Sequence, residues 1–150
     1  MISLTLPPCE IKTRTSGGRT LIYDFLRRRY VTLTPEEWVR QHFTHFLVNH
    51  REFPAALLAN EVSLTVGGVQ RRCDSVLYHH MGGMPRVIVE YKAPTVPITQ
   101  QVFQQIYAYN SVLRASYLMV SNGVKHYCCH VDYERHEVCY LPDIPHYAAL

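Results

Sequence analysis

Two pairs of adjacent glycines divide the middle of the chain into three apolar runs, and this pattern restricts the fold more than any other feature. Gly67-Gly68 separates residues 57–66 from residues 72–78, and Gly82-Gly83 separates the second run from residues 86–92. Each run is rich in β-branched and apolar residues, and a glycine pair between such runs is typical of a hairpin turn. The sequence therefore predicts a three-stranded antiparallel meander in the middle of the chain.

Helical patterns lie on both sides of this meander. Thr34 stands directly before Pro35 and three residues before Glu37, an order typical of an N-cap, a first helical position and a capping box. Apolar residues then recur at helical spacing up to about Asn49, and we interpret Trp38 as a core residue of this face. A second helix is predicted over residues 99–113, where apolar residues recur every three or four positions.

The rest of the chain completes an α/β pattern. Residues 115–121 form a short apolar run, and residues 124–131 and 137–141 resemble a final pair of strands. Because a helix separates the third and fourth strands, the fourth can return parallel to the third. We expect a restriction-endonuclease-like α/β fold: a central four-stranded mixed sheet flanked by helices, with extra C-terminal strands.

The N-terminal segment has a different character. Residues 1–20 contain Pro7-Pro8 and Ser16-Gly17-Gly18, and we expect an irregular arm there. Residues 23–31 mix aromatic side chains with arginines and predict either an extended or a short helical segment. We assign residues 21–150 to a single domain, a usual length for one.

The amino-acid composition limits the kinds of protein that this chain can be. Hydrophobic residues make up 47% of the chain and charged residues 18%, which indicates a globular protein. The net charge of +3 permits a nucleic-acid partner but does not by itself indicate one. No apolar run is long enough for a membrane helix, and the start does not resemble a signal peptide. Five cysteines without paired spacing favour reduced thiols, so we expect a cytoplasmic protein with no membrane partner.

The residues that indicate chemistry are Asp74, Glu90 and Lys92. Side chains alternate along a strand, so Glu90 and Lys92 project from one face about 7 Å apart. Asp74 lies on the neighbouring strand of the same hairpin and can be brought beside Glu90. Unpaired buried charges are strongly disfavoured, and a divalent cation removes this cost. Two carboxylates with water suit Mg²⁺ or Mn²⁺, which activates water for phosphodiester hydrolysis, while Lys92 could orient that water.

A structural explanation remains open for these residues. Glu90 and Lys92 could form an ion pair at a strand end, and Asp74 could be an acid near a turn. The polar stripe of Gln101, Gln105 and Tyr109 on the second helix favours the catalytic interpretation, because it could face the same site. Glu37 is interpreted first as the capping-box acid; either Glu37 or Glu36 could instead reach the metal directly or through water.

These residues together resemble a known family. Asp74, Glu90-x-Lys92 and Gln105-x-x-x-Tyr109 resemble the PD-(D/E)xK nucleases that also carry a QxxxY motif. The segments LTPEEWVRQHF, IVEYKAP, QQIYAYN and SNGVKHYCC resemble the N-terminal nuclease domain of the type I restriction enzyme R subunit, in particular its stand-alone bacterial forms. The resemblance covers residues 21–145.

The resemblance implies roles for these residues. Asp74 and Glu90 would bind the metal, Lys92 would be the catalytic lysine, and Gln105 and Tyr109 would position nucleic acid or the active-site groups. Which first-helix glutamate matches the family, Glu36 or Glu37, stays open. Arg71 and Arg72 are further candidates for nucleic-acid contact.

The chain departs from the family pattern in two respects. Cys73 stands where the family name has proline, and the GKT or GKS phosphate loop of a helicase motor is missing, so we expect no ATP-driven translocation by this chain. The sequence predicts a Mg²⁺-dependent DNA endonuclease. The alternative is a weak or inactive nucleic-acid-binding or partner-binding module of the same fold. Expected partners are DNA and either a second copy of the chain or separate restriction and helicase subunits.

Overall fold

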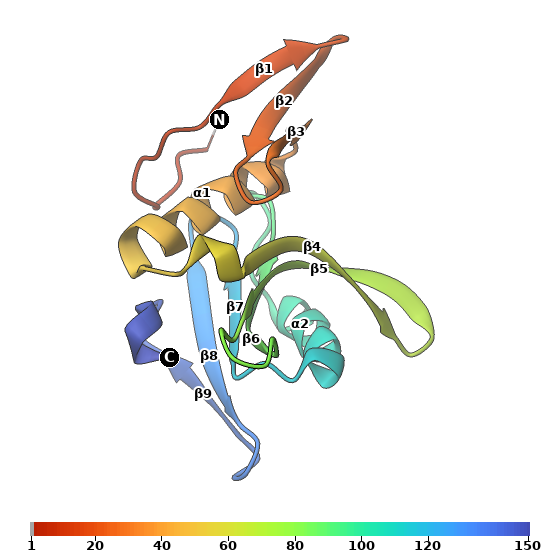
Figure 1. The fold of residues 1–150 in the computed structure, drawn as a ribbon, viewed down its shortest axis with the longest axis vertical. Coiled ribbons are helices and arrows are strands. Elements are labelled where there is room, and N and C mark those ends of the chain that lie inside the picture. The colour runs from red at the N-terminus through yellow and green to blue at the C-terminus, as the bar shows by residue number, and fades with distance from the viewer. Residues whose placement is uncertain (1) are drawn as a thin grey trace.

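Two helices and two sheets make up the structure, a computed structural model that describes residues 2–150 (Figure 1). The helices are α1 (Pro35–Arg51) and α2 (Gln100–Leu113), with two short 3₁₀ turns at Ala55–Leu57 and Tyr147–Ala149. The strands are β1 (Thr13–Ser16), β2 (Arg19–Asp24), β3 (Arg29–Thr32), β4 (Leu58–Val66), β5 (Val69–Tyr78), β6 (Pro85–Tyr91), β7 (Tyr117–Ser121), β8 (His126–Asp132) and β9 (Glu137–Leu141). Among the described residues, neither helix combines the length and the apolar character needed to cross a membrane.

The larger sheet runs in the order β4-β5-β6-β7-β8-β9. Strands β4, β5 and β6 form the predicted antiparallel meander, and β7 lies parallel to β6 after the crossover through α2. The expectation of an α/β fold is confirmed, but a four-stranded central sheet is not. Strand β8 pairs with β7, and β9 with β8, so the two C-terminal strands continue the same sheet to six strands.

The smaller sheet corrects the expectation of an irregular arm only from residue 13 onward, since residues 2–12 lie in no helix or strand. Strands β1 and β2 form a hairpin whose turn, Gly17-Gly18, has φ angles of 58° and 76°. Strand β3 pairs with β2, so residues 23–31 are extended at both ends rather than helical. The periodicity was too weak to predict these strands, because Ile22 is their only fully buried apolar residue.

Helix α1 covers one face of the larger sheet. It begins as predicted: the Thr34 hydroxyl accepts a hydrogen bond from the Glu37 backbone N–H at 3.1 Å. Its buried residues Val39 and Phe43 belong to one core with Val89 of β6, whereas Trp38 is only half-buried. The interpretation of Trp38 as a core residue is therefore wrong, since Val39, one position on, faces the sheet instead.

Helix α2 packs over a second core, in which Ile106 of the helix meets Val76 and Ile88 of the sheet. Strand β6 thus contributes Val89 to one core and Ile88 to the other. Because side chains alternate along a strand, Glu90 lies on the same face as Ile88, the face toward α2. The carboxylate therefore lies at the end of a strand that is buried on both faces.

Candidate active site

The structure brings Asp74, Glu90 and Lys92 together at the end of the β5–β6 pair. The register joins Ser75 to Val89, which places Asp74 beside Glu90 at the next position. The Asp74 carboxylate accepts a hydrogen bond from the Tyr91 backbone N–H at 2.8 Å. Lys92 Nζ lies 3.8 Å from Glu90 Oε1. The three residues expected from the sequence therefore form one cluster.

Glu90 lacks the partners that a buried carboxylate needs. The residue is 4% exposed, and its Oε2 atom has no hydrogen-bond partner among the described residues. Burial, and then the neighbouring Asp74 carboxylate, raise the pKa of Glu90 to about 9 despite Lys92 nearby. Burial also raises the pKa of Asp74 above its usual value. Two carboxylates in this state fit a divalent cation, which would supply the missing partner and favour ionisation of both.

The protein ligands for such a cation are few. Within residues 2–150, no group of three or more His, Cys, Asp or Glu residues is arranged to hold a metal ion. Mg²⁺ commonly binds through one or two carboxylates and keeps waters or substrate phosphates as its remaining ligands. The donor set of Asp74 and Glu90 is therefore compatible with Mg²⁺ or Mn²⁺ rather than with a metal that needs a closed protein cage.

Lys92 is held from the α2 side by the two residues of the QxxxY motif. Its Nζ donates to Gln105 Oε1 at 3.0 Å, and Gln105 Nε2 donates to the Tyr109 hydroxyl at 3.1 Å. Tyr109 is 5% exposed, so the far end of this chain of hydrogen bonds is fixed in the core. Gln101, the first residue of the predicted stripe, is exposed. The helical spacing of Gln105 and Tyr109 thus sets the position of the lysine head group.

The glutamates of the first helix do not join this cluster directly. The buried Glu37 carboxylate accepts hydrogen bonds from Arg27 at 2.6 Å, Arg40 at 3.2 Å and Gln41 at 3.2 Å. The Glu37 carboxylate thus binds these three side-chain donors in place of the Thr34 backbone N–H that a capping box requires. Glu36 is exposed. That Glu36 or Glu37 coordinates the metal stays a prediction.

Arg40 and Glu61 belong to the site and were not expected from the sequence. Arg40 Nη2 donates to Glu61 and lies 3.4 Å from Asp74 Oδ1. Burial lowers the pKa of Arg40, but the carboxylates of Glu37, Asp74 and Glu61 outweigh it and raise the pKa. The spacing of Glu37 and Arg40 on the helix could have indicated their ion pair. The position of Glu61 could not be predicted, because its backbone has φ of 58° within β4.

A chain of buried polar side chains joins the smaller sheet to the strands of the site. Asn60 Nδ2 donates to Asp24 Oδ2 at 2.9 Å, and the Ser75 hydroxyl donates to Asn60 Oδ1 at 2.6 Å. The Tyr91 hydroxyl donates to Ser75 Oγ at 3.0 Å. Ser75 and Tyr91 are the neighbours of Asp74 and Glu90 in sequence. The polar chain therefore fixes the backbone on which the two carboxylates stand.

Arg71 and Arg72 lie outside this cluster, on the exposed part of β5. Strands β4 and β5 extend there as a curved hairpin away from the rest of the sheet (Figure 1). The Arg72 side chain is 69% exposed, and its Nη1 atom lies 3.7 Å from Glu61 Oε2. Both arginines are therefore accessible from solvent, and Arg72 lies beside Glu61 of the site.

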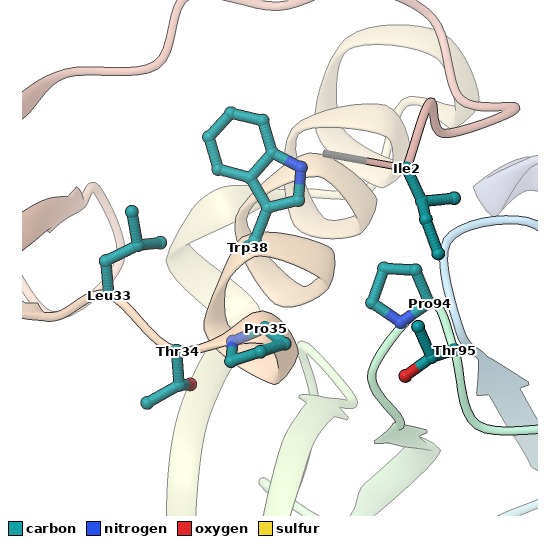
Figure 2. A pocket seen from close by; sticks show the side chains of 7 residues that line it. All are labelled: Ile2, Leu33, Thr34, Pro35, Trp38, Pro94 and Thr95. Carbon is teal, nitrogen blue, oxygen red and sulfur yellow. The ribbon is translucent and has the colours of Figure 1, made fainter.

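An apolar cavity of about 420 Å³ lies beside the first turn of α1. Figure 2 shows its lining, which consists of Ile2, Leu33, Thr34, Pro35, Trp38, Pro94 and Thr95. None of the predicted catalytic residues lines it, although Pro94 follows Lys92 by two positions. The half-buried Trp38 forms part of its wall. The candidate active site is thus defined by its polar geometry and not by this cavity.

Comparison with known proteins shows the family and the fold of the chain. Residues 35–145 match the family model described as type I restriction enzyme R protein N terminus (HSDR_N). Among solved structures, a fragment described as an HsdR subunit of a type I restriction enzyme from Vibrio vulnificus YJ016 has a TM-score of 0.55 and 24% sequence identity. That match covers 75% of this chain and 24% of the other chain, and at this identity it shows the fold alone. No curated protein matches the chain in sequence.

Proposed function

The chain belongs to the family of type I restriction enzyme R protein N-terminal domains, and we propose that it is a metal-dependent nuclease of the PD-(D/E)xK class that cleaves DNA. The observation that carries the proposal is the cluster of Asp74, Glu90 and Lys92, in which a buried carboxylate oxygen has no partner among the described residues. A structural ion pair explains this poorly, because Lys92 lies 3.8 Å from Glu90 and leaves the other carboxylate oxygen unsatisfied.

Each residue of the cluster has a defined task in this proposal. Asp74 and Glu90 would hold Mg²⁺ or Mn²⁺. Such an ion lowers the pKa of bound water and polarises a phosphate oxygen. Lys92 orients the attacking water and offsets the negative charge that develops on the phosphate. Gln105 keeps the Lys92 head group in place, and Tyr109 in turn fixes Gln105.

The partners follow from the same proposal. Arg72, which is exposed beside Glu61, and Arg71, which is exposed at the preceding position on the opposite face of β5, are the candidate contacts to the DNA backbone. A double-strand break needs two cuts, so a homodimer is one way to make it, and association with separate restriction or helicase subunits is another. The match covers 24% of the length of the HsdR chain, so the activity and partners of that whole protein come to this chain only as part of the proposal.

One observation favours a second function, a nucleic-acid-binding module of the same fold with weak or no catalysis. The Arg40 guanidinium lies 3.4 Å from Asp74 Oδ1 and already neutralises part of the charge that a metal would meet. In that case the fold and the exposed arginines would serve binding alone. The two functions differ in their need for a metal and for Lys92.

A cleavage assay separates the two functions. Wild type, Asp74→Ala, Lys92→Ala and the control Glu134→Ala, in an exposed turn, are incubated with supercoiled plasmid, single-stranded circles and branched DNA. Each reaction is run with Mg²⁺, Mn²⁺ or EDTA, and folding is checked by circular dichroism. The nuclease is supported by cleavage that needs metal, is retained in Glu134→Ala and is lost in both site variants. Absence of cleavage by wild type, or cleavage unchanged in both site variants, would overturn it.

A further inference from the structure

The ribbon of β1 and β2 carries an exposed basic surface that the candidate active site does not use. Lys12, Arg14 and Arg19 are exposed on it, and Arg28 and Arg29 are exposed at the turn into β3. The one acid between residues 11 and 33 is Asp24, which is fully buried and paired with Arg27. The outer surface of the smaller sheet is therefore positively charged without a compensating carboxylate of its own.

The strand register gathers Lys12, Arg14 and Arg19 on one face of the sheet. Ser16 pairs with Arg19, and Arg14 with Leu21, so these side chains share a face with the next alternate residue of β2, Tyr23. The Arg14 guanidinium lies 4.1 Å from the centre of the Tyr30 ring, and Lys12 Nζ lies 6.0 Å from that of Tyr23. Stacking on a tyrosine restricts the arginine side chain while its donors stay in solvent. The face is thus arranged in advance for contact with anions.

The tip of the ribbon consists of polar residues and glycine. From Thr13 to Thr20 all side chains are threonine, arginine, serine or glycine, and every residue is exposed. The ribbon projects beyond the rest of the protein at one end (Figure 1). Its exposed side chains carry hydrogen-bond donors and acceptors and no large apolar group, so the tip does not resemble the apolar centre of a protein–protein interface.

The ribbon is nevertheless fixed to the active-site strands. Asp24 at the end of β2 accepts from Asn60 of β4 at 2.9 Å, and Arg27 donates to Glu37 of α1 at 2.6 Å. The family match begins at residue 35, so the ribbon lies outside the part of the chain that the family model covers. A ligand on the ribbon would therefore be held at a set position relative to Asp74 and Glu90.

We propose that the β1–β2 ribbon docks into the major groove of duplex DNA, with Arg14 and Arg19 on the flanking phosphates. The inference rests on the proposed function for its substrate and adds a second contact to it. The major groove of B-DNA admits a two-stranded β-ribbon, whereas that of A-form RNA is too narrow. Single strands bind by base stacking on free aromatic rings, but Arg14 covers Tyr30 here. Duplex DNA is therefore the ligand that the ribbon fits.

The test measures binding separately from cleavage. Fluorescence anisotropy follows a labelled DNA duplex, a single strand of the same sequence and the matching RNA duplex, all with the full chain in EDTA over a series of salt concentrations. The variant is Arg14→Gln/Arg19→Gln. Its control, Arg114→Gln/Arg135→Gln, also removes one arginine stacked on a tyrosine and one exposed arginine. Arg135 lies in the β8–β9 turn, at the opposite end of the molecule (Figure 1).

The ribbon variant is expected to bind duplex DNA about tenfold more weakly than wild type at low salt, and the control is expected to match wild type. The slope of log affinity against log salt should become shallower by about two, the change for two lost phosphate contacts. Ser16→Glu, which adds a negative charge beside Arg19 and leaves the Arg14–Tyr30 stack in place, should also weaken binding.

The outcomes distinguish this inference from the proposed function. Metal-dependent cleavage by wild type together with unchanged duplex affinity in the ribbon variants would overturn the inference and leave the nuclease standing. Weakened binding in those variants alone, with no cleavage by wild type, would support the ribbon and overturn the nuclease. Equal losses of duplex affinity in the ribbon variant and its control would mean that only the net charge of the protein matters, and would overturn the inference. A loss confined to single strands or to the RNA duplex would also overturn it.

Discussion

Replacing Asp24 with asparagine tests whether the buried polar chain holds the two sheets together. The Asp24 side chain is fully buried and accepts hydrogen bonds from the backbone N–H groups of Leu26 at 2.8 Å and Arg27 at 3.1 Å. It also accepts from the side chains of Arg27 and Asn60. An asparagine has one acceptor oxygen where the aspartate has two, so its amide group must face either these side-chain donors or the backbone donors.

The expected cost follows from the donors that lose their acceptor. A buried donor without a partner costs about 1–3 kcal/mol, and breaking a buried ion pair costs about 3–5 kcal/mol. Arg27 keeps Glu37 as a second partner at 2.6 Å, so the expected loss lies below the sum of these two costs, at the lower end of the range for a buried ion pair. We expect Asp24→Asn to lower the free energy of unfolding by about 3 kcal/mol. For a chain of this size that corresponds to a fall in Tm of roughly 6–12 °C.

Urea unfolding at neutral pH measures this loss, with Asp143→Asn as the control. Asp143 also pairs with an arginine, Arg51 at 3.6 Å, but its side chain is 78% exposed, so its replacement should cost under about 1 kcal/mol. Burial raises the pKa of Asp24, but hydrogen bonds from Asn60 and Arg27 outweigh it and lower the pKa. The stabilisation is then present above the ordinary carboxyl pKa and is lost as pH falls through the lowered value. An Asp24→Asn stability equal to wild type at neutral pH would refute this reasoning.

Three further substitutions probe the site and its surroundings. Because burial raises the pKa of Glu90 to about 9, metal-free wild type should lose stability as pH rises from about 4.5 toward 9. Glu90→Gln should avoid this loss and exceed wild type by about 2–4 kcal/mol at pH near 8 in urea unfolding, with no difference near pH 4; equal pH profiles would contradict it. Gln105→Ala frees Lys92 and should lower kcat for DNA cleavage about 10- to 100-fold with little change in KM; a change in KM alone would indicate a role in binding. Gly123→Ala should cost about 1–2 kcal/mol, because φ is +82° there and the new Cβ would lie 2.6 Å from Leu4 Cδ2; calorimetric stability equal to wild type would contradict the strain.

Local signals predicted the strands and helices that carry the site. The glycine pairs at 67–68 and 82–83 placed Asp74 and Glu90 on adjacent strands, and strand alternation placed Glu90 and Lys92 on one face, which in the structure is the face toward α2. Helical spacing on α2 likewise aligned Gln105 with Tyr109. These features depend on contacts between near neighbours in sequence or across one hairpin, which a pattern of residue types can indicate.

The features that sequence reasoning missed depend on long-range packing. The smaller sheet buries Ile22 and Asp24 but leaves the other residues of its strands at least partly exposed, so alternation of polar and apolar residues is weak there. Glu37 was expected to close a capping box, but Arg27 and Arg40 approach it only in the folded chain. Glu61 reaches Arg40 through a left-handed backbone conformation that no side-chain pattern indicates.

The binding of one divalent cation by Asp74 and Glu90 is the most direct test of the proposed centre. Mn²⁺ titrated into the full chain by calorimetry at neutral pH should bind with a stoichiometry of one per chain and raise Tm. Asp74→Asn and Glu90→Gln should each lose this binding, whereas Asp143→Asn should retain it. No Mn²⁺ binding by wild type at millimolar concentration, or binding that survives both site substitutions, would contradict a metal-dependent centre at these residues.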